Sequence, residues 1–220
     1  MLEDSLEQYC KKEKMKIKLT LLVLIILQLS CKNDSEKHNK TGKDQIQKIE
    51  IETQKKKTIT FEFEKFKISK GEIGDIKIGM NIIDAEKELD NLTKEEADAY
   101  SFGFDGGGNA YIYSFKNQPI LALVPNYLEK IIAIIALNKN LRTNNGLNPK
   151  SKISEIQSKY PNIEIHLDEM MDWEGMSDEK NNWGFIFMTE ENNRIGKYKD
   201  IYMPTVPIRT ETKMNWILIY

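Results

Sequence analysis

The stretch Lys130-Ile-Ile-Ala-Ile-Ile-Ala-Leu137 decides the fold that this sequence predicts. A run of β-branched and apolar residues is typical of a strand, and we expect one over residues 128–137. The chain ends on Lys213-Met-Asn-Trp-Ile-Leu-Ile-Tyr220, which resembles this run at a displacement of 83 positions. Two similar strands, one in each half of the folded part, indicate an internal duplication.

Two amphipathic helices support the duplication. The first begins at Asn81, a good helix cap, and presents an apolar face formed by Ile82, Ala85, Leu89 and Leu92. The second presents the same face 71 positions later, at Ile153, Ile156, Tyr160 and Ile163. Because 83 exceeds 71, the second half would contain an insertion of about 12 residues, within the loops 170–182 and 190–207. Two helices of one spacing also arise by chance in α+β domains, so a single undivided domain remains the alternative.

Further strands complete the predicted fold. They cover residues 110–115 and 120–124 after the first helix, and 183–188, 201–203 and 214–220 after the second. Ile59, Phe61 and Phe63 alternate with polar residues, which predicts a strand where the domain begins. The predicted fold class is α+β, with antiparallel sheets and one helix per half, and the halves cover residues 58–143 and 144–220.

The front of the chain has the order of a signal peptide. Residues 15–30 comprise a basic start, an apolar run of 11 residues from Leu19 to Leu29, and Ser30. A transmembrane helix is the weaker alternative, because about 20 apolar residues are needed to cross a bilayer. Since Met15 opens the basic region so well, we expect residues 1–14 to lie upstream of the true start.

Leu27-Gln-Leu-Ser-Cys31 resembles the lipobox of bacterial lipoproteins, although Gln28 stands where Leu is common. The resemblance implies that a diacylglyceryl group joins the Cys31 thiol, that the chain is cut between Ser30 and Cys31, and that acyl chains such as palmitate insert into membrane lipid. Two or three acyl chains give durable anchoring. An ordinary secretory signal followed by a chance cysteine is the alternative.

Residues 31–57 are predicted to form a flexible tether, because they are rich in charged and amide side chains and poor in apolar ones. Lys32 stands where an aspartate would retain a lipoprotein in the inner membrane, so the resemblance implies the outer membrane. Either a periplasmic or a surface-facing position fits. The run Lys55-Lys56-Lys57 is interpreted as part of the solvated tether, with contact to anionic lipid as the alternative.

The globular part resembles known folds in the order of its helices and strands. Gly79-Met80 opens into a helix that is followed by antiparallel strands, which resembles the helix-plus-sheet units of outer-membrane assembly lipoproteins and the tandem-repeat β-lactamase-inhibitor fold. Residues 70–165 also resemble uncharacterised bacterial lipoproteins, for example at Gly74-Asp-Ile-Lys-Ile-Gly79-Met80. These resemblances imply no chemistry.

Three segments are candidate sites of chemistry. The acidic loop around Gly175 offers Asp172, Glu174 and Asp178 as a weak calcium candidate, with a solvated loop as the alternative. His166 and Asp168 would share one strand face, where they could serve a hydrolase. This is the least favoured function, because the serine that it requires is not identified. The glycine-rich segment 105–109 is interpreted as a turn between the expected strands 102–104 and 111–113, because no phosphate-binding Lys follows it.

Composition narrows the function further. The net charge of -2 argues against a nucleic-acid partner. Cys10 and Cys31 lie on opposite sides of the expected cleavage point, so no disulfide or thiolate metal site is expected in the mature domain. No cofactor is expected either. The tryptophans and methionines either line a groove or fill the core: Trp173, Trp183, Trp216, Met170, Met171, Met176 and Met188. We expect a lipid-anchored, non-enzymatic envelope protein that binds a protein, peptide or envelope component. A structural subunit of an outer-membrane complex is the alternative.

Overall fold

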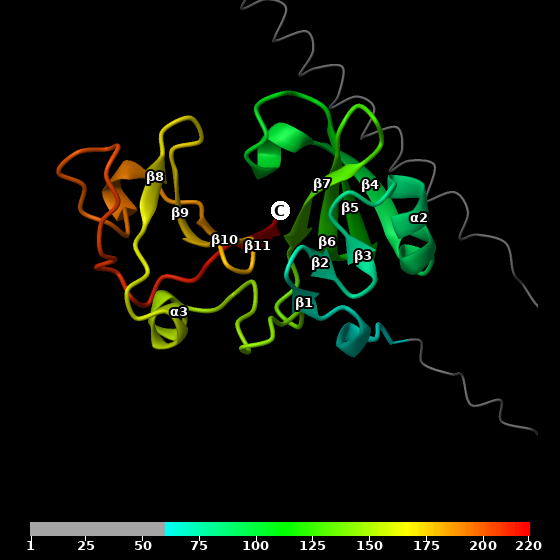
Figure 1. Ribbon diagram of the computed structural model, residues 1–220, viewed down its shortest axis with the longest axis horizontal. Helices are drawn as coiled ribbons and strands as arrows, with labels where there is room; N and C mark the ends of the chain where they lie inside the picture. Colours follow the sequence, from blue (N-terminus) through cyan, green and yellow to red (C-terminus); the bar gives the residue numbers. More distant parts are fainter. Residues whose placement is uncertain (1–59) are drawn as a thin grey trace, which may run out of the picture. The chain divides into compact units, whose positions relative to one another are not determined.

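An eight-stranded antiparallel sheet runs through the part of the chain that the computed structural model describes, residues 60–220 (Figure 1). Its strand order is β4-β5-β6-β7-β11-β10-β9-β8. The first four strands in the chain are β4 (Thr93–Asp98), β5 (Asn109–Phe115), β6 (Gln118–Pro125) and β7 (Ile131–Ala136). The last four are β8 (His166–Asp168), β9 (Trp173–Asp178), β10 (Trp183–Phe187) and β11 (Trp216–Ile219). The predicted signal peptide, Cys31 and the tether lie outside the described residues.

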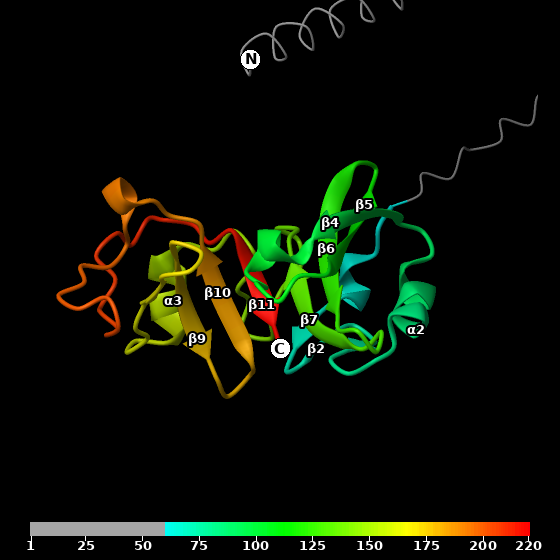
Figure 2. The ribbon, with the colours of Figure 1, turned by 90° about the horizontal axis from the view of Figure 1, so that it is seen from above.

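The two halves of the sheet meet at β7 and β11, which lie between them in both views (Figures 1 and 2). Ile135 pairs with Leu218, and this pair is flanked by Ile134 with Ile219 and by Ala136 with Ile217. The sheet is therefore continuous from β4 to β8, which form its two edges.

Short helices and a small sheet cover one face. The helical elements are α2 (Ile82–Glu86) with η2 (Lys87–Leu89), and α3 (Ile153–Lys159). The small antiparallel sheet consists of β1 (Ile68–Ser69), β2 (Glu72–Ile73) and β3 (Ile76–Lys77). Their buried isoleucines join those of the central strands in one large core cluster. The opposite face holds a smaller cluster, which includes Ile135 and Trp216.

The predicted helix faces are confirmed in their first turns, and the helices are short, so that Leu92, Tyr160 and Ile163 lie beyond them and are only partly buried. Ile82, Ala85, Ile153 and Ile156 are all buried. The Asn81 side chain accepts a hydrogen bond from the Ile83 N–H at 3.0 Å, as expected of a cap. At the second helix, the Glu155 carboxylate accepts the Lys152 N–H at 2.7 Å.

The two helices contact the last strand of their half in the same way. Three backbone contacts between the α2 start and the β7 start recur between α3 and β11, each helix residue displaced by 71 and each strand residue by 83. Ile82 N donates to Glu129 O, as Ile153 N does to Thr212 O. Ile131 N donates to Met80 O, as Met214 N does to Ser151 O. The β-bridge Asn81–Lys130 likewise corresponds to the bridge Lys152–Lys213.

Several expectations were wrong. The fold is richer in β-structure than the predicted α+β class, because α2 and α3 have only 5 and 7 residues. Residues 201–203 form a turn rather than a strand, and Pro204 and Pro207, which cannot donate to a ladder, follow them. The alternating start of the domain instead contains the 3-10 helix η1 (Phe63–Lys65).

The strand expected at residues 102–104, as the partner of residues 111–113, is not formed either. Phe102 ends the 3-10 helix η3 (Ala99–Phe102) and packs against Trp216 at 5.7 Å between ring centroids. The strand that pairs with β5 on the side away from β6 is β4. The hydropathy pattern missed it because Thr93–Asp98 lies exposed at the edge and has almost no apolar residue. Among residues 60–220, no helix has the length and apolar character needed to cross a membrane.

Replacing Ile134 by Ala is expected to lower the free energy of unfolding by about 2–5 kcal/mol, because the change leaves a cavity. Ile134 is fully buried in β7, whereas Ile132, two residues away in the same strand, is 40% exposed. Ile132→Ala is therefore the matched control and should cost far less. Urea unfolding followed by circular dichroism measures both, and equal losses would contradict the position of β7 in the core.

Candidate functional site

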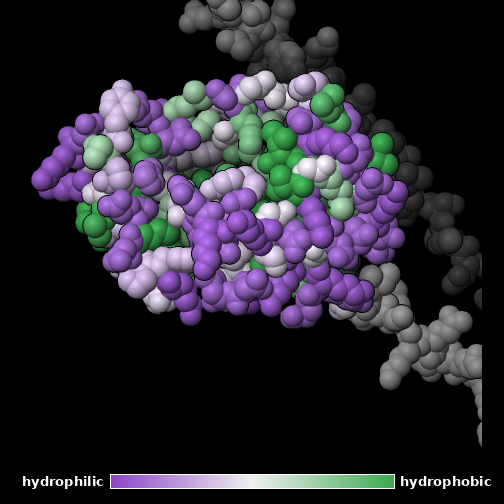
Figure 3. Space-filling model, viewed as in Figure 1, coloured by the Kyte–Doolittle hydropathy of each residue, from purple (hydrophilic) through white to green (hydrophobic). Residues whose placement is uncertain are grey.

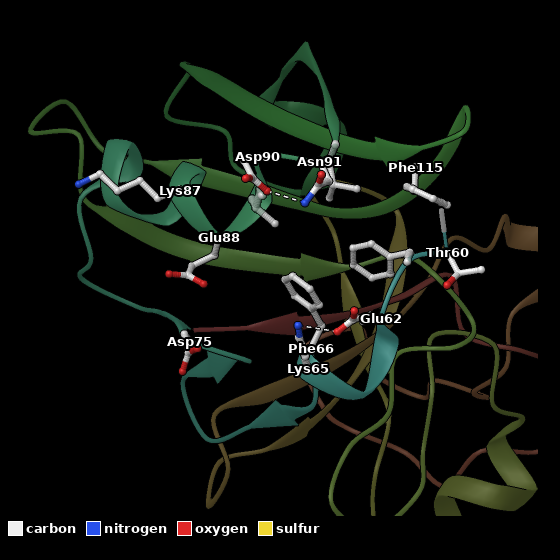
Figure 4. Close-up of a pocket in the computed structure, with 13 residues that line it drawn as sticks. Thr60, Glu62, Lys65, Phe66, Asp75, Lys87, Glu88, Asp90, Asn91 and Phe115 are labelled. Atoms are coloured by element: carbon white, nitrogen blue, oxygen red, sulfur yellow. Dashed lines mark hydrogen bonds and ion pairs between the residues drawn. The ribbon is translucent and has the colours of Figure 1, made fainter. Parts of the chain in front are cut away.

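A groove of about 840 Å³ opens in the first half of the domain, between the start of the described chain, η2 and the turn from β2 to β3 (Figure 4). We call it the aromatic groove. Its lining residues are Thr60, Phe61, Glu62, Lys65, Phe66, Asp75, Lys87, Glu88, Leu89, Asp90, Asn91, Leu92 and Phe115. A smaller hollow of about 290 Å³ shares Thr60, Phe61 and Phe115 with it, so the depression continues past Phe61.

Three phenylalanines form the apolar wall of the aromatic groove. Phe61 stacks on Phe66 at 4.8 Å between ring centroids and lies 5.9 Å from Phe115 of β5. Phe66 is nearly buried, whereas Phe61 and Phe115 remain partly accessible. Flat, partly accessible rings of this kind bind apolar side chains, and their faces attract cations.

A close approach of two backbones places Asp75 at the rim. Gly74 has a φ of 57°, and a Cβ at this position would lie 2.4 Å from the carbonyl oxygen of Lys65. Only glycine fits there, so the turn from β2 to β3 comes directly against η1. In Figure 4 the Asp75 and Glu88 carboxylates lie on the same side of the opening, while Lys87 extends away from it.

The rim carries an excess of negative charge. Lys65 is paired with Glu62 at 2.5 Å, and Lys87 is paired with Asp84 at 2.7 Å, so both lysines are neutralised locally. The remaining acids are Asp75, Glu88 and Asp90, and none of them forms an ion pair with a described residue. Asp90 accepts a hydrogen bond from the Asn91 side chain at 2.7 Å, but its charge is not balanced by a described cation. Three carboxylates without an ion pair, beside an aromatic wall, favour a cationic ligand.

A partly exposed contact fixes α2, which leads into the groove, on the sheet. Glu86 accepts hydrogen bonds from Lys94 at 2.5 Å and from the Tyr113 hydroxyl at 2.8 Å. Burial alone would raise the pKa of Glu86, but these two donors outweigh it and lower the pKa below its usual value. Glu86 therefore stays charged near neutral pH and holds α2 against β5.

The structure does not bring the three calcium candidates together. Asp172 pairs with Arg194, Asp178 accepts from Asn181, and Glu174 is turned into the interior. Within residues 60–220, no three acidic, histidine or cysteine side chains are grouped so that they could hold a metal ion.

Glu174 is instead a buried anchor for the long loop that follows β10. Only 1% of the residue is exposed, and its carboxylate accepts four hydrogen bonds. The donors are Thr189 Oγ1 at 2.7 Å, Ile195 N at 2.7 Å, Gly196 N at 2.8 Å and the Tyr198 hydroxyl at 2.8 Å. Burial and the hydrogen bond to Glu174 raise the pKa of Tyr198 well above its usual value, so Tyr198 stays a donor.

His166 and Asp168 are both exposed on the edge strand β8. The Asp168 carboxylate accepts from the backbone N–H groups of Met170 and Met171 at 3.0 and 3.1 Å. The glycine-rich segment forms an exposed turn between η3 and β5, with φ of 71° at Gly107 and 107° at Gly108.

Two of the three tryptophans meet. Trp173 and Trp216 pack edge to face at 5.3 Å between centroids, and the buried indole nitrogen of Trp216 has no hydrogen-bond partner among the described residues. Trp183 belongs to the core on the opposite face and donates to Ser69 O at 3.0 Å. Met176 is buried, whereas Met170 and Met188 are exposed.

The aromatic groove was missed by sequence reasoning. The alternation of Phe61 and Phe63 with polar residues predicts one face of a strand, which hides the packing of Phe61 on Phe66 and Phe115. The spacing of three phenylalanines within six residues, 61–66, was the available signal.

Replacing Glu174 by Ala is expected to lower the free energy of unfolding by at least about 2 kcal/mol, because it leaves buried donors without an acceptor. The amides of Ile195 and Gly196 should exchange hydrogen faster. Glu169→Ala removes an exposed carboxylate nearby and is the control. Unchanged exchange at both amides would contradict the anchoring role.

Comparison with known proteins finds a likeness among solved structures. No family model matches the chain, and no curated protein matches it. Among solved structures, the crystal structure of the uncharacterized protein yfeY from Escherichia coli is similar, with a TM-score of 0.48 and 13% sequence identity. The match covers 70% of this chain and 98% of that one.

Proposed function

We propose that this protein is a lipid-anchored, non-enzymatic binding module of the cell envelope, and that its aromatic groove binds a basic segment of a peptide or protein. The observation that carries the proposal is the combination, in one depression, of a phenylalanine wall with three carboxylates that form no ion pair with a described residue. Such a site matches a chain in which Lys or Arg alternates with apolar residues.

The two parts of the groove would act on different groups of the ligand. Apolar side chains bind against Phe61 and Phe115, where they leave water. A Lys or Arg side chain placed near Asp75 and Glu88 gains charge-assisted hydrogen bonds, and the neighbouring rings add a cation–π contribution. Because the acids are exposed, this attraction weakens as salt is added.

A fluorescein-labelled peptide in which Lys alternates with Leu and Phe tests the groove. It should bind the full chain, and the double variant Asp75→Asn/Glu88→Gln should bind it roughly tenfold more weakly, since each exposed ion pair contributes up to about 1 kcal/mol. Fluorescence anisotropy at low and high salt measures the affinity.

The matched control is Glu190→Gln/Glu191→Gln, which removes two exposed acids of the second half. A peptide with Glu in place of Lys should not bind. Equal weakening by both double variants would show binding to negative charge in general and would contradict the groove. Recovery of a stoichiometric resident complex after crosslinking of membranes would instead favour an assembly subunit.

The lipid anchor is proposed at Cys31 on the strength of the lipobox resemblance, with the outer membrane as the location. Cys31→Ser is expected to abolish labelling by radioactive palmitate, because the acceptor thiol is lost. Cys10→Ser is the matched control and should leave labelling unchanged. Persistent labelling of the Cys31→Ser chain would contradict the anchor.

We further infer that the domain arose by tandem duplication of a unit with one helix and four strands. The mirrored strand order and the recurrence of three helix-to-strand contacts at the displacements of 71 and 83 support this inference. The pairing of Ile135 with Leu218, which are themselves 83 residues apart, is what a twofold axis between the copies requires. The proposed copies have diverged: the aromatic groove belongs to the first, and the long loop after β10 to the second.

A further inference from the structure

The long loop of the second half presents a group of exposed hydrophobic side chains. We define residues 197–209 as the apolar loop. Ile201, Tyr202, Met203, Val206 and Ile208 are exposed by 45%, 77%, 61%, 63% and 63%. Figure 3 shows hydrophobic side chains at the left edge of the molecule, where Figure 1 draws this loop in orange and red. Single exposed hydrophobic residues are common, but five within eight positions form a patch that needs a partner.

The backbone of the apolar loop is held firmly, so the exposure is not that of a loose segment. Thr205 exchanges two backbone hydrogen bonds with Ile165, at 2.8 and 3.0 Å, and Ile208 N donates to Ile195 O at 2.9 Å. A Cβ on Gly196 would lie 2.5 Å from the Thr205 methyl, so only glycine allows this approach. Glu174 holds the two residues directly before the apolar loop, Ile195 and Gly196, and accepts a hydrogen bond from the Tyr198 hydroxyl within it. The hydrophobic side chains are therefore directed outward by a rigid support.

Positive charge accompanies the patch. Lys197, Lys199 and Arg209 are exposed within the apolar loop, against the single acid Asp200. Arg209 donates a hydrogen bond to Asn192 O at 3.1 Å, whereas the two lysines form no ion pair with a described residue. The Asp200 carboxylate accepts the Tyr202 N–H at 3.0 Å, so it also serves the turn. Apolar side chains and a tyrosine flanked by these lysines match the surface of a bilayer that contains anionic lipid.

We infer that the apolar loop inserts into the interface of an anionic phospholipid membrane. Tyr202, Met203, Val206 and Ile208 enter the boundary between headgroups and acyl chains, while Lys197, Lys199 and Arg209 contact the phosphates. This contact is independent of acylation at Cys31 and of the aromatic groove. It gives the folded domain a membrane contact of its own, through its second half.

An environment-sensitive fluorophore at position 203 tests the inference. The full chain carrying Cys10→Ser and Cys31→Ser receives Met203→Cys, and the new thiol is labelled. On vesicles of phosphatidylethanolamine and phosphatidylglycerol, the emission should shift to the blue and be quenched by brominated acyl chains. The quenching should be weaker with vesicles of phosphatidylcholine alone. The double variant Lys197→Gln/Lys199→Gln should lose most of the quenching.

The matched control is Tyr127→Cys in the same background, because Tyr127 is 91% exposed in the turn between β6 and β7 of the first half. Its label should remain in water on the same vesicles. A label at 203 that stays in water, whether or not the chain sediments with vesicles, would overturn the inference. A blue shift at 203 that rises with protein concentration in the absence of lipid would assign the patch to a second copy and would equally overturn it.

Discussion

The pairing of β7 with β11 is the constraint on which the rest of the structure depends. It joins two four-stranded sheets at their inner edges, so that backbone donors and acceptors of both strands are satisfied by each other. The apolar runs of these strands supply both faces of the sheet: Ile134 and Ile217 belong to the large core, whereas Ile135 and Trp216 belong to the smaller one. Neither half could expose this edge and these side chains to water on its own.

Sequence patterns predicted those parts of the fold in which local periodicity and burial agree. The apolar faces of the two helices were predicted because their apolar residues recur about every 3.6 positions. The central strands were predicted because they are short apolar runs. β4 was invisible because an edge strand in water needs no apolar pattern. The prediction of a strand at 201–203 was wrong for the opposite reason: the residues are apolar, but they are exposed in a turn.

The candidate site was harder to predict than the fold, because its parts come from distant positions. Phe115 meets Phe61 only through the packing of β5 against the start of the domain, and nothing near either residue encodes that contact. Glu174 was grouped with its acidic neighbours as a calcium candidate. Its true partners lie 15 to 24 residues away along the chain, and they make a buried carboxylate tolerable by four hydrogen bonds.

The two edge strands have a consequence for the behaviour of many copies at once. β4 carries Lys94, Glu95 and Glu96 along an exposed rim, and β8 is only 3 residues long. Charged or very short edges are poor templates for a strand from another molecule. A lipid-anchored protein is crowded with its neighbours in two dimensions, where open sheet edges would invite polymerisation. With the proposed anchor at Cys31, crowding would raise the local density of aromatic grooves while the sheets stay separate.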